Sequence, residues 1–136
     1  MAGRYGMSFA AKLTQEGKYL EAIEEATRAA ARDEEDPVPL VERAGALAWL
    51  ERYPEAVKDL EAALTLDETA GVLELDVVDD AYFSALLGAA KIESRTSLEA
   101  ADRTLARYGT VLPAGRHLAD AAAWPERLRA NTSVGS

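Results

Sequence analysis

The sequence predicts an all-α protein, and three observations support this fold class. The 136 residues include 28 alanines and only five prolines, a composition that favours helices. Apolar residues recur at intervals of three and four in several segments, and no segment alternates as a half-buried strand would. A pattern of residues also repeats after 34 positions, which is long enough for two helices and a turn.

The first two helices can be placed from periodicity and from the break between them. Leu20, Ile23 and Thr27 fall on one face of a helix predicted at 19–32. The acidic run 33–36 and Pro37 end this helix, because negative charge opposes the helix dipole there and proline cannot continue the hydrogen-bond ladder. Asp36 is then a suitable N-cap for a helix at about 37–51.

The remaining helices are predicted at about 54–66, 77–93, 97–108 and 115–129. Residues 67–71 break the pattern after the first of these, and the acids at 76–80 can cap the second. Thr96 and Glu99 form a capping box for the third, which Gly109 closes. The last helix is expected to be disturbed at Pro125.

The internal repeat is the most informative feature of the sequence. Residues 18–25 align with 52–59 at a shift of 34, and small residues recur twelve positions apart on successive helices. This pattern resembles the tetratricopeptide repeat (TPR) family, in which such residues allow the two helices of a repeat to cross closely. The residues that carry this packing signature are Ala10, Ala22, Ala29, Ala44, Ala56, Ala63, Gly88 and Ala100.

The resemblance implies a short right-handed solenoid of stacked antiparallel hairpins. We expect one domain over 1–136, with repeats at about 4–36, 37–70 and 77–110 and a C-terminal capping helix at about 114–130. About ten additional residues are inserted near 68–78, because the spacing from Ala56 to Ala100 is 44 instead of 34. The third repeat is divergent, since Arg107 stands where a small residue is expected.

Charge and composition exclude several classes of function. The net charge of −9 argues against a nucleic-acid surface and an anionic-membrane binder, both of which need basic patches. No apolar run is long enough to span a membrane and no signal peptide is evident, so a cytoplasmic location is expected. The absence of cysteine excludes disulfides and thiol catalysis.

Catalytic, cofactor and metal sites are not predicted. His117 is the single histidine, with Asp120 one turn away, and no nucleophile is suggested beside it. We interpret it as a solvated or capping residue. The acids Asp76, Asp79 and Asp80 lack the regular spacing of a metal loop and are better explained as a helix start.

The helices at 37–51 and 77–93 carry more apolar surface than one packing stripe requires. In the TPR family the first helix of each repeat lines the inner groove where peptides bind. The resemblance therefore implies a groove floor of Met7, Ala11, Thr14, Val41, Gly45, Ala48, Trp49, Tyr82, Ala85, Ala89 and Ile92. None of these is basic or asparagine, which argues against the family's mode of holding a C-terminal carboxylate.

These features predict a non-enzymatic adaptor or chaperone that binds an apolar helix or peptide segment of another protein in the groove. One alternative is self-assembly, as a homodimer or larger oligomer, through the groove and the C-terminal helix. Another is that the chain's own C-terminal helix, with Leu118, Ala121 and Trp124, covers the floor. A small enzyme or regulatory subunit is the remote alternative.

Overall fold

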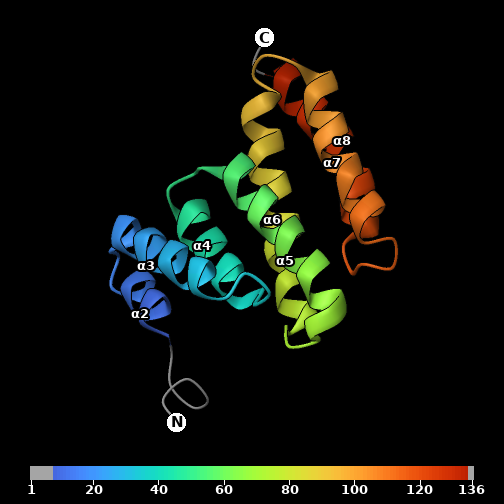
Figure 1. Cartoon of the computed structure of the whole chain (residues 1–136). Coiled ribbons are helices and arrows are strands. Elements are labelled where there is room, and N and C mark those ends of the chain that lie inside the picture. Colours follow the sequence, from blue (N-terminus) through green and yellow to red (C-terminus); the bar gives the residue numbers. More distant parts are fainter. Residues whose placement is uncertain (1–7, 135–136) are drawn as a thin grey trace. The chain divides into compact units, whose positions relative to one another are not determined.

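The computed structural model describes residues 8–134, and these residues form helices joined by short turns (Figure 1). The helices are α2 (Phe9–Gln15), α3 (Tyr19–Arg32), α4 (Val38–Trp49), α5 (Tyr53–Ala70), α6 (Leu75–Glu93), α7 (Leu98–Val111) and α8 (Leu118–Val134). The all-α prediction is confirmed, and the boundaries of α3 coincide with those predicted. The other helices with a predicted start, α4 to α8, begin within about three residues of it.

The chain divides into two compact units, which are described separately: unit 1, Met1–Glu74, and unit 2, Leu75–Ser136. The boundary falls inside the segment 68–78, where the sequence indicated an insertion. Most of that insertion is helical, because α5 continues to Ala70 and α6 already begins at Leu75. Gly71 ends α5 in the left-handed conformation (φ 62°) that glycine adopts without strain.

Asp67 explains why α5 continues past its predicted end. Its carboxylate is only 8% exposed and accepts hydrogen bonds from the backbone N–H groups of Val72 and Leu73, at 2.7 and 3.0 Å. The residue therefore does not break the helix. Asp67 stays within α5, and its hydrogen bonds hold the following turn against the end of the helix. The two N–H donors satisfy its buried carboxylate.

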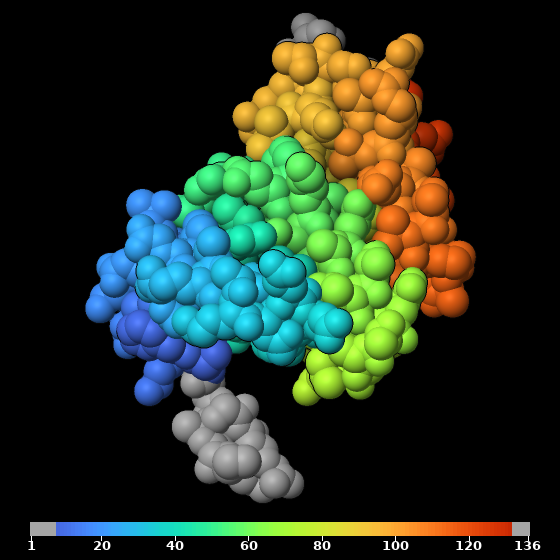
Figure 2. Space-filling view, in the orientation of Figure 1, coloured from blue at the N-terminus to red at the C-terminus, as the bar shows by residue number. Residues whose placement is uncertain are grey.

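Unit 1 is a chain of antiparallel hairpins. Each of α2, α3 and α4 packs against the next helix, and α2 also contacts α4. The space-filling view shows α3, in light blue, at the surface of this unit (Figure 2). Five alanines of the predicted signature are at most 3% exposed: Ala10, Ala22, Ala44, Ala56 and Ala63. Ala29 is half-buried.

The turns inside the first two hairpins repeat the same geometry after 34 residues. Gly17 and Glu51 both have positive φ, at 78° and 59°. In each turn the next backbone N–H donates to a carbonyl five residues back, Lys18 to Leu13 (2.8 Å) and Arg52 to Leu47 (2.9 Å). These paired hydrogen bonds are typical of a helix that ends on a left-handed residue. The sequence repeat is therefore also a repeat of backbone conformation.

Unit 2 consists of the α6–α7 hairpin with α8 packed on α7 and touching α6. Its core includes Ala90, Ala101, Leu105 and Leu128, with Trp124 packed against them. The predicted small pair Gly88 and Ala100 is only half-buried, and the buried small residues lie one position later, at Ala89 and Ala101. One residue rotates a helix face by about 100°, so the packing faces of α6 and α7 differ from those predicted.

Two local expectations in unit 2 are corrected. Ser97, not Thr96, caps α7: its hydroxyl accepts from the Ala100 N–H at 3.1 Å, while the Thr96 hydroxyl donates to the Glu93 carbonyl. Pro125 lies inside α8, which continues to Val134, beyond the predicted end at about 129. In unit 1, the N-cap of α4 is Pro37, one residue after the predicted Asp36, whose carboxylate accepts from the Val38 N–H at 3.0 Å.

Candidate functional site

The candidate site is a surface of unit 1 formed by the first helix of each hairpin. Its members are the predicted floor residues of this unit; two of them, Gly45 and Trp49, are exposed and the others are half-buried. We call this set the α2–α4 face; it consists of Ala11 and Thr14 on α2 and of Val41, Gly45, Ala48 and Trp49 on α4. The predicted floor residue Met7 lies outside the described residues.

Trp49 is the largest side chain on this face and is 67% exposed. It is the last residue of α4, and its indole stacks on the ring of Tyr19, the first residue of α3, with centroids 5.7 Å apart and planes within 9°. Stacking fixes the indole in one orientation while most of its surface remains in contact with solvent. Trp49 is therefore a surface residue held in place by Tyr19, and it does not fill the core.

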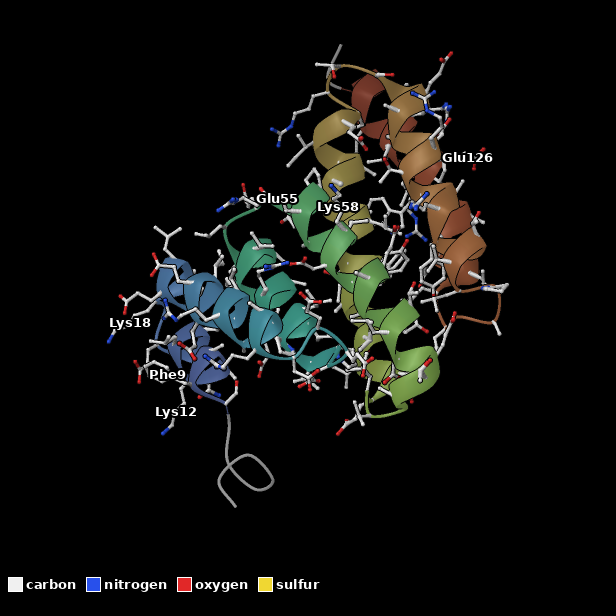
Figure 3. The ribbon with its side chains drawn as sticks, in the orientation of Figure 1. Phe9, Lys12, Lys18, Glu55, Lys58 and Glu126 are labelled. Atoms are coloured by element: carbon white, nitrogen blue, oxygen red, sulfur yellow. The ribbon has the colours of Figure 1, made fainter. Side chains whose placement is uncertain are left out.

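The residues around Trp49 leave space above the helix. A Cβ atom built on Gly45 would meet no atom within 4 Å beyond the adjacent residues and the backbone of its own helix. Gly45 is exposed, and Val41 and Ala48 are half-buried. On the adjoining helix, Phe9 and Lys12 project from α2 (Figure 3). A partner could thus approach the backbone of α4 closely beside a large aromatic side chain.

Glu42 lies at the edge of this face, between Val41 and Gly45 along α4. Its carboxylate is half-buried and accepts a hydrogen bond from the hydroxyl of Ser8, which also caps α2 through the Ala11 N–H. Burial raises the pKa of Glu42, the Ser8 hydrogen bond acts in the opposite direction, and nearby Asp36 adds to the increase. Sequence analysis did not single out Glu42, because an acid on a predicted helix is usually a solvated residue.

The predicted floor residues in unit 2 need a correction. Tyr82, Ala85 and Ala89 are at most 6% exposed, so they cannot form an open floor. They lie on the buried stripe of α6, where the Tyr82 ring stacks on Tyr108 with centroids 6.2 Å apart. Ile92 is 41% exposed. Most of the additional apolar side chains of α6 are therefore buried within unit 2 and do not form an open surface.

A buried polar network joins α6 to the loop after α7. The Tyr108 hydroxyl donates to the Asp79 carboxylate and accepts from the His117 backbone N–H at 2.8 Å, while Asp79 also accepts from the Arg116 N–H at 2.9 Å. Burial, together with the Asp79 hydrogen bond, raises the pKa of Tyr108 to about 12. Asp79 is therefore a tertiary anchor and not the helix cap predicted for it.

His117 is held beside this network. Its ring stacks on Phe83 with centroids 4.6 Å apart, its Nε2 lies 2.7 Å from the Asp80 carboxylate, and its Nδ1 lies 3.7 Å from that of Asp120. The hydrogen bond to His117 lowers the pKa of Asp80. In the part of the chain that the structure describes, no serine or threonine hydroxyl hydrogen-bonds to His117. The arrangement is that of a packed structural histidine.

A second hollow in unit 1, of about 530 Å³, lies over α4 between α3 and α5. Its main polar group is Arg43, which donates to both Asp59 carboxylate oxygens at 2.7 Å and to the Thr27 hydroxyl at 3.1 Å. Glu55 and Lys58 project from α5 beside it (Figure 3). Arg43 is therefore already engaged by Asp59 and Thr27 and is not available to a ligand.

Neither a metal centre nor a membrane segment is found among the described residues. Over 8–134, no three histidine, aspartate or glutamate side chains converge as ligands of one ion. None of the helices described is both long and apolar enough to cross a bilayer.

Comparison with solved structures identifies the fold. The second TPR domain of the human RPAP3 protein, in complex with the HSP70 peptide SGPTIEEVD, matches 88% of this chain and 88% of its own, with 23% identity and a TM-score of 0.56. The chain has the tetratricopeptide-repeat fold. The first TPR of Spaghetti (RPAP3), bound to the HSP90 peptide SRMEEVD, matches 93% of this chain and 90% of its own, with 22% identity and a TM-score of 0.53.

No protein-family model matches the sequence, and no curated protein does. The TPR fold is therefore recognised from the backbone and from the 34-residue spacing, while the sequence is only 22–23% identical to those of the similar structures. The α2–α4 face consists of residues from α2 and α4, the first helices of the first two hairpins.

Proposed function

We propose that this chain is a non-enzymatic protein-interaction module, an adaptor or chaperone, that holds an apolar helix or peptide segment of another protein on the α2–α4 face. The observation that carries the proposal is the exposure of Trp49. An indole that is two-thirds exposed, held in orientation by Tyr19 and flanked by small residues can bury a large apolar area when a partner binds.

The similar structures support this proposal in a general way, since both are TPR domains with a bound peptide. Their peptides end in Glu-Glu-Val-Asp and are acidic. The α2–α4 face of this chain offers no basic side chain among its six members, so we do not carry the acidic ligand over. Self-assembly, in which a second copy occupies the same face, is the alternative within this class.

A substitution at Gly45 tests the proposal, because it should weaken partner binding without lowering the stability of the fold. Because nothing beyond the adjacent residues and the backbone of its own helix lies within 4 Å of its Cβ position, Gly45→Leu should fit without strain. It should not lower the free energy of unfolding, since glycine within a helix costs about 0.5–1 kcal/mol relative to alanine and leucine is almost as favourable as alanine. The leucine side chain would nevertheless occupy the space through which a partner approaches.

The probe is a peptide selected from a random 16-residue phage-displayed library panned on the wild-type protein. We expect Gly45→Leu to weaken its binding at least tenfold in isothermal titration calorimetry, with an unchanged or higher melting temperature. Ala31→Leu, which adds the same side chain at an exposed position of α3, should bind within about twofold of wild type. Equal affinity of Gly45→Leu and wild type, or a selection that yields no binder, contradicts the proposal.

A further inference from the structure

The half-buried carboxylate of Glu42 has neither a cation within 4 Å nor a backbone N–H donor among the described residues, whereas the buried Asp67 accepts from two backbone N–H groups. Asp59 forms an ion pair with Arg43 at 2.7 Å, and Glu25 pairs with Arg28 and Arg32. Glu42 receives only the hydroxyl hydrogen bond of Ser8. Burying a carboxylate without a counter-charge is unfavourable, and this is reflected in its raised pKa.

The position of Glu42 connects this carboxylate with the aromatic side chain proposed to bind the partner. Glu42 and Trp49 are seven residues apart on α4, which is two helical turns, so both lie on the same side of the helix about 10.5 Å apart along its axis. Gly45 lies between them on α4, and because it has no side chain, the space between Glu42 and Trp49 is open. One partner segment could therefore contact both.

The charge of unit 1 has the same sign as Glu42. Residues 1–74 contain 16 acids and eight bases, a net charge of −8, whereas residues 75–136 have a net charge of −1. The negative electrostatic potential that this net charge produces around unit 1 attracts cationic segments and repels acidic ones. Lys12 is exposed on α2 near Ser8 in sequence, but it forms no ion pair with Glu42 within 4 Å and is one positive charge in a strongly acidic unit.

We propose that the segment bound by the α2–α4 face is a cationic amphipathic helix of another protein, with a lysine or arginine that pairs with Glu42 and a large apolar side chain, two turns away, that packs on Trp49. This inference rests on the proposed function and specifies the chemistry of the partner. It is opposite in charge to the acidic peptides of the two similar structures.

The experiment uses the same phage-displayed library, panned in parallel on wild type and on Glu42→Gln. Glutamine keeps an acceptor for the Ser8 hydroxyl, so the fold should be retained, which a melting curve checks. We expect wild type to enrich sequences with lysine or arginine about seven positions from an aromatic or large aliphatic residue. On Glu42→Gln the apolar enrichment should remain and the basic enrichment should disappear.

A double-mutant cycle then measures the pairing directly. For a selected peptide, replacing its lysine by glutamine should weaken binding to wild type about tenfold, as expected for a charge-assisted hydrogen bond that is partly shielded from water. The same replacement should change binding to Glu42→Gln less than twofold. Glu24→Gln, which removes the same charge from an exposed position of α3, should behave like wild type.

The outcomes separate this inference from the proposed function. If the selected peptides are neutral or acidic, or if the basic enrichment persists on Glu42→Gln, the cationic partner is overturned, while a loss of binding in Gly45→Leu still supports the α2–α4 face. If Gly45→Leu binds normally, the proposed function itself fails. If wild type sediments as a dimer and Gly45→Leu as a monomer, the occupant is a second copy and the inference is also overturned.

Discussion

The Tyr108 hydroxyl and the Asp79 carboxylate, 29 residues apart in the sequence, form a buried hydrogen bond that joins α7 to α6. Both carboxylate oxygens are used, because the second accepts from the Arg116 N–H. The loop that connects α7 to α8 is thereby fastened to α6. Helix α8, which packs on α7 and touches α6, follows this loop.

Gly115 lies close to this bond, and its substitution by alanine is expected to be destabilising. A Cβ atom at this position would come within 2.2 Å of the Tyr108 hydroxyl oxygen and 2.7 Å of the ring carbon that bears it. We expect Gly115→Ala to lower the free energy of unfolding by about 1–3 kcal/mol, as overpacking does elsewhere. Denaturation by urea measures this change. A stability equal to that of wild type would contradict the packing described.

Tyr108→Phe provides the complementary prediction. Alone it should destabilise the protein by about 1–3 kcal/mol, because Asp79 loses a donor and the His117 N–H loses its acceptor. In the Gly115→Ala background its additional effect should be smaller, since removing the hydroxyl relieves the closest contact of the new methyl group. Strictly additive effects in the double variant would show that the two residues do not interact.

The pairing of Asp80 with His117 predicts a dependence on pH. The hydrogen bond from His117, followed by the charge of Arg116, lowers the pKa of Asp80 below its ordinary value. A carboxyl group with a lowered folded-state pKa stabilises the fold above its unfolded pKa of about 3.9, and this contribution is lost as the pH falls through the folded pKa.

His117→Phe, which can retain the stacking on Phe83, should therefore raise the pKa of Asp80, as carboxyl-carbon NMR titration would show. The stability of wild type should then decrease more steeply below about pH 4 than that of the variant. Arg116→Gln should raise the pKa of Asp80 by less. An unchanged Asp80 titration in His117→Phe would contradict the assigned contact.

Ala56 tests the close packing of unit 1. It is fully buried at the start of α5, one repeat after Ala22, which is 1% exposed. Ala56→Phe should overpack this site and cost about 1–3 kcal/mol or more. Glu24→Ala, at an exposed position of α3, should change stability by less than about 0.5 kcal/mol. Equal melting temperatures for Ala56→Phe and wild type would contradict the close helix approach inferred from the repeat.

Trp49→Ala should have a small effect on stability and a large effect on binding. Because the indole is 67% exposed, its removal mainly abolishes the stacking on Tyr19, which is worth about 0.5–1.5 kcal/mol. A buried tryptophan would cost about 3–5 kcal/mol. Affinity for the selected peptide should fall by at least about 2 kcal/mol. Val72→Ala, at another exposed apolar position, should leave affinity unchanged.

Local signals in the sequence predicted much of the fold. Helix α3 has clear ends, because Gly17 and Lys18 precede it and the acids at 33–36 follow it. The shift of 34 that aligns residues 18–25 with 52–59 also relates the preceding residues Gly17 and Glu51, and their backbone conformations agree. Such features depend on residues close together in the chain, so a single sequence is sufficient to find them.

Contacts between distant residues could not be predicted in the same way. Asp79 was interpreted as a helix cap because nothing near it in sequence indicates Tyr108 as its partner. Tyr82 and Ala85 were assigned to an open floor because a helix rich in apolar residues does not reveal which side is covered. Tyr19 belonged to a recognised repeat motif, yet its stacking on Trp49 joins the start of one helix to the end of another.

The most direct test of the account is the solvent accessibility of Trp49 with and without a bound peptide. In a Trp124→Phe background, Trp49 is the only tryptophan, and acrylamide quenching of its fluorescence reports its exposure. The account predicts efficient quenching in the free protein and strong protection when the selected peptide is present at saturation. If saturating peptide leaves the quenching of Trp49 unchanged, the partner does not bind on this indole and the proposed α2–α4 site is wrong.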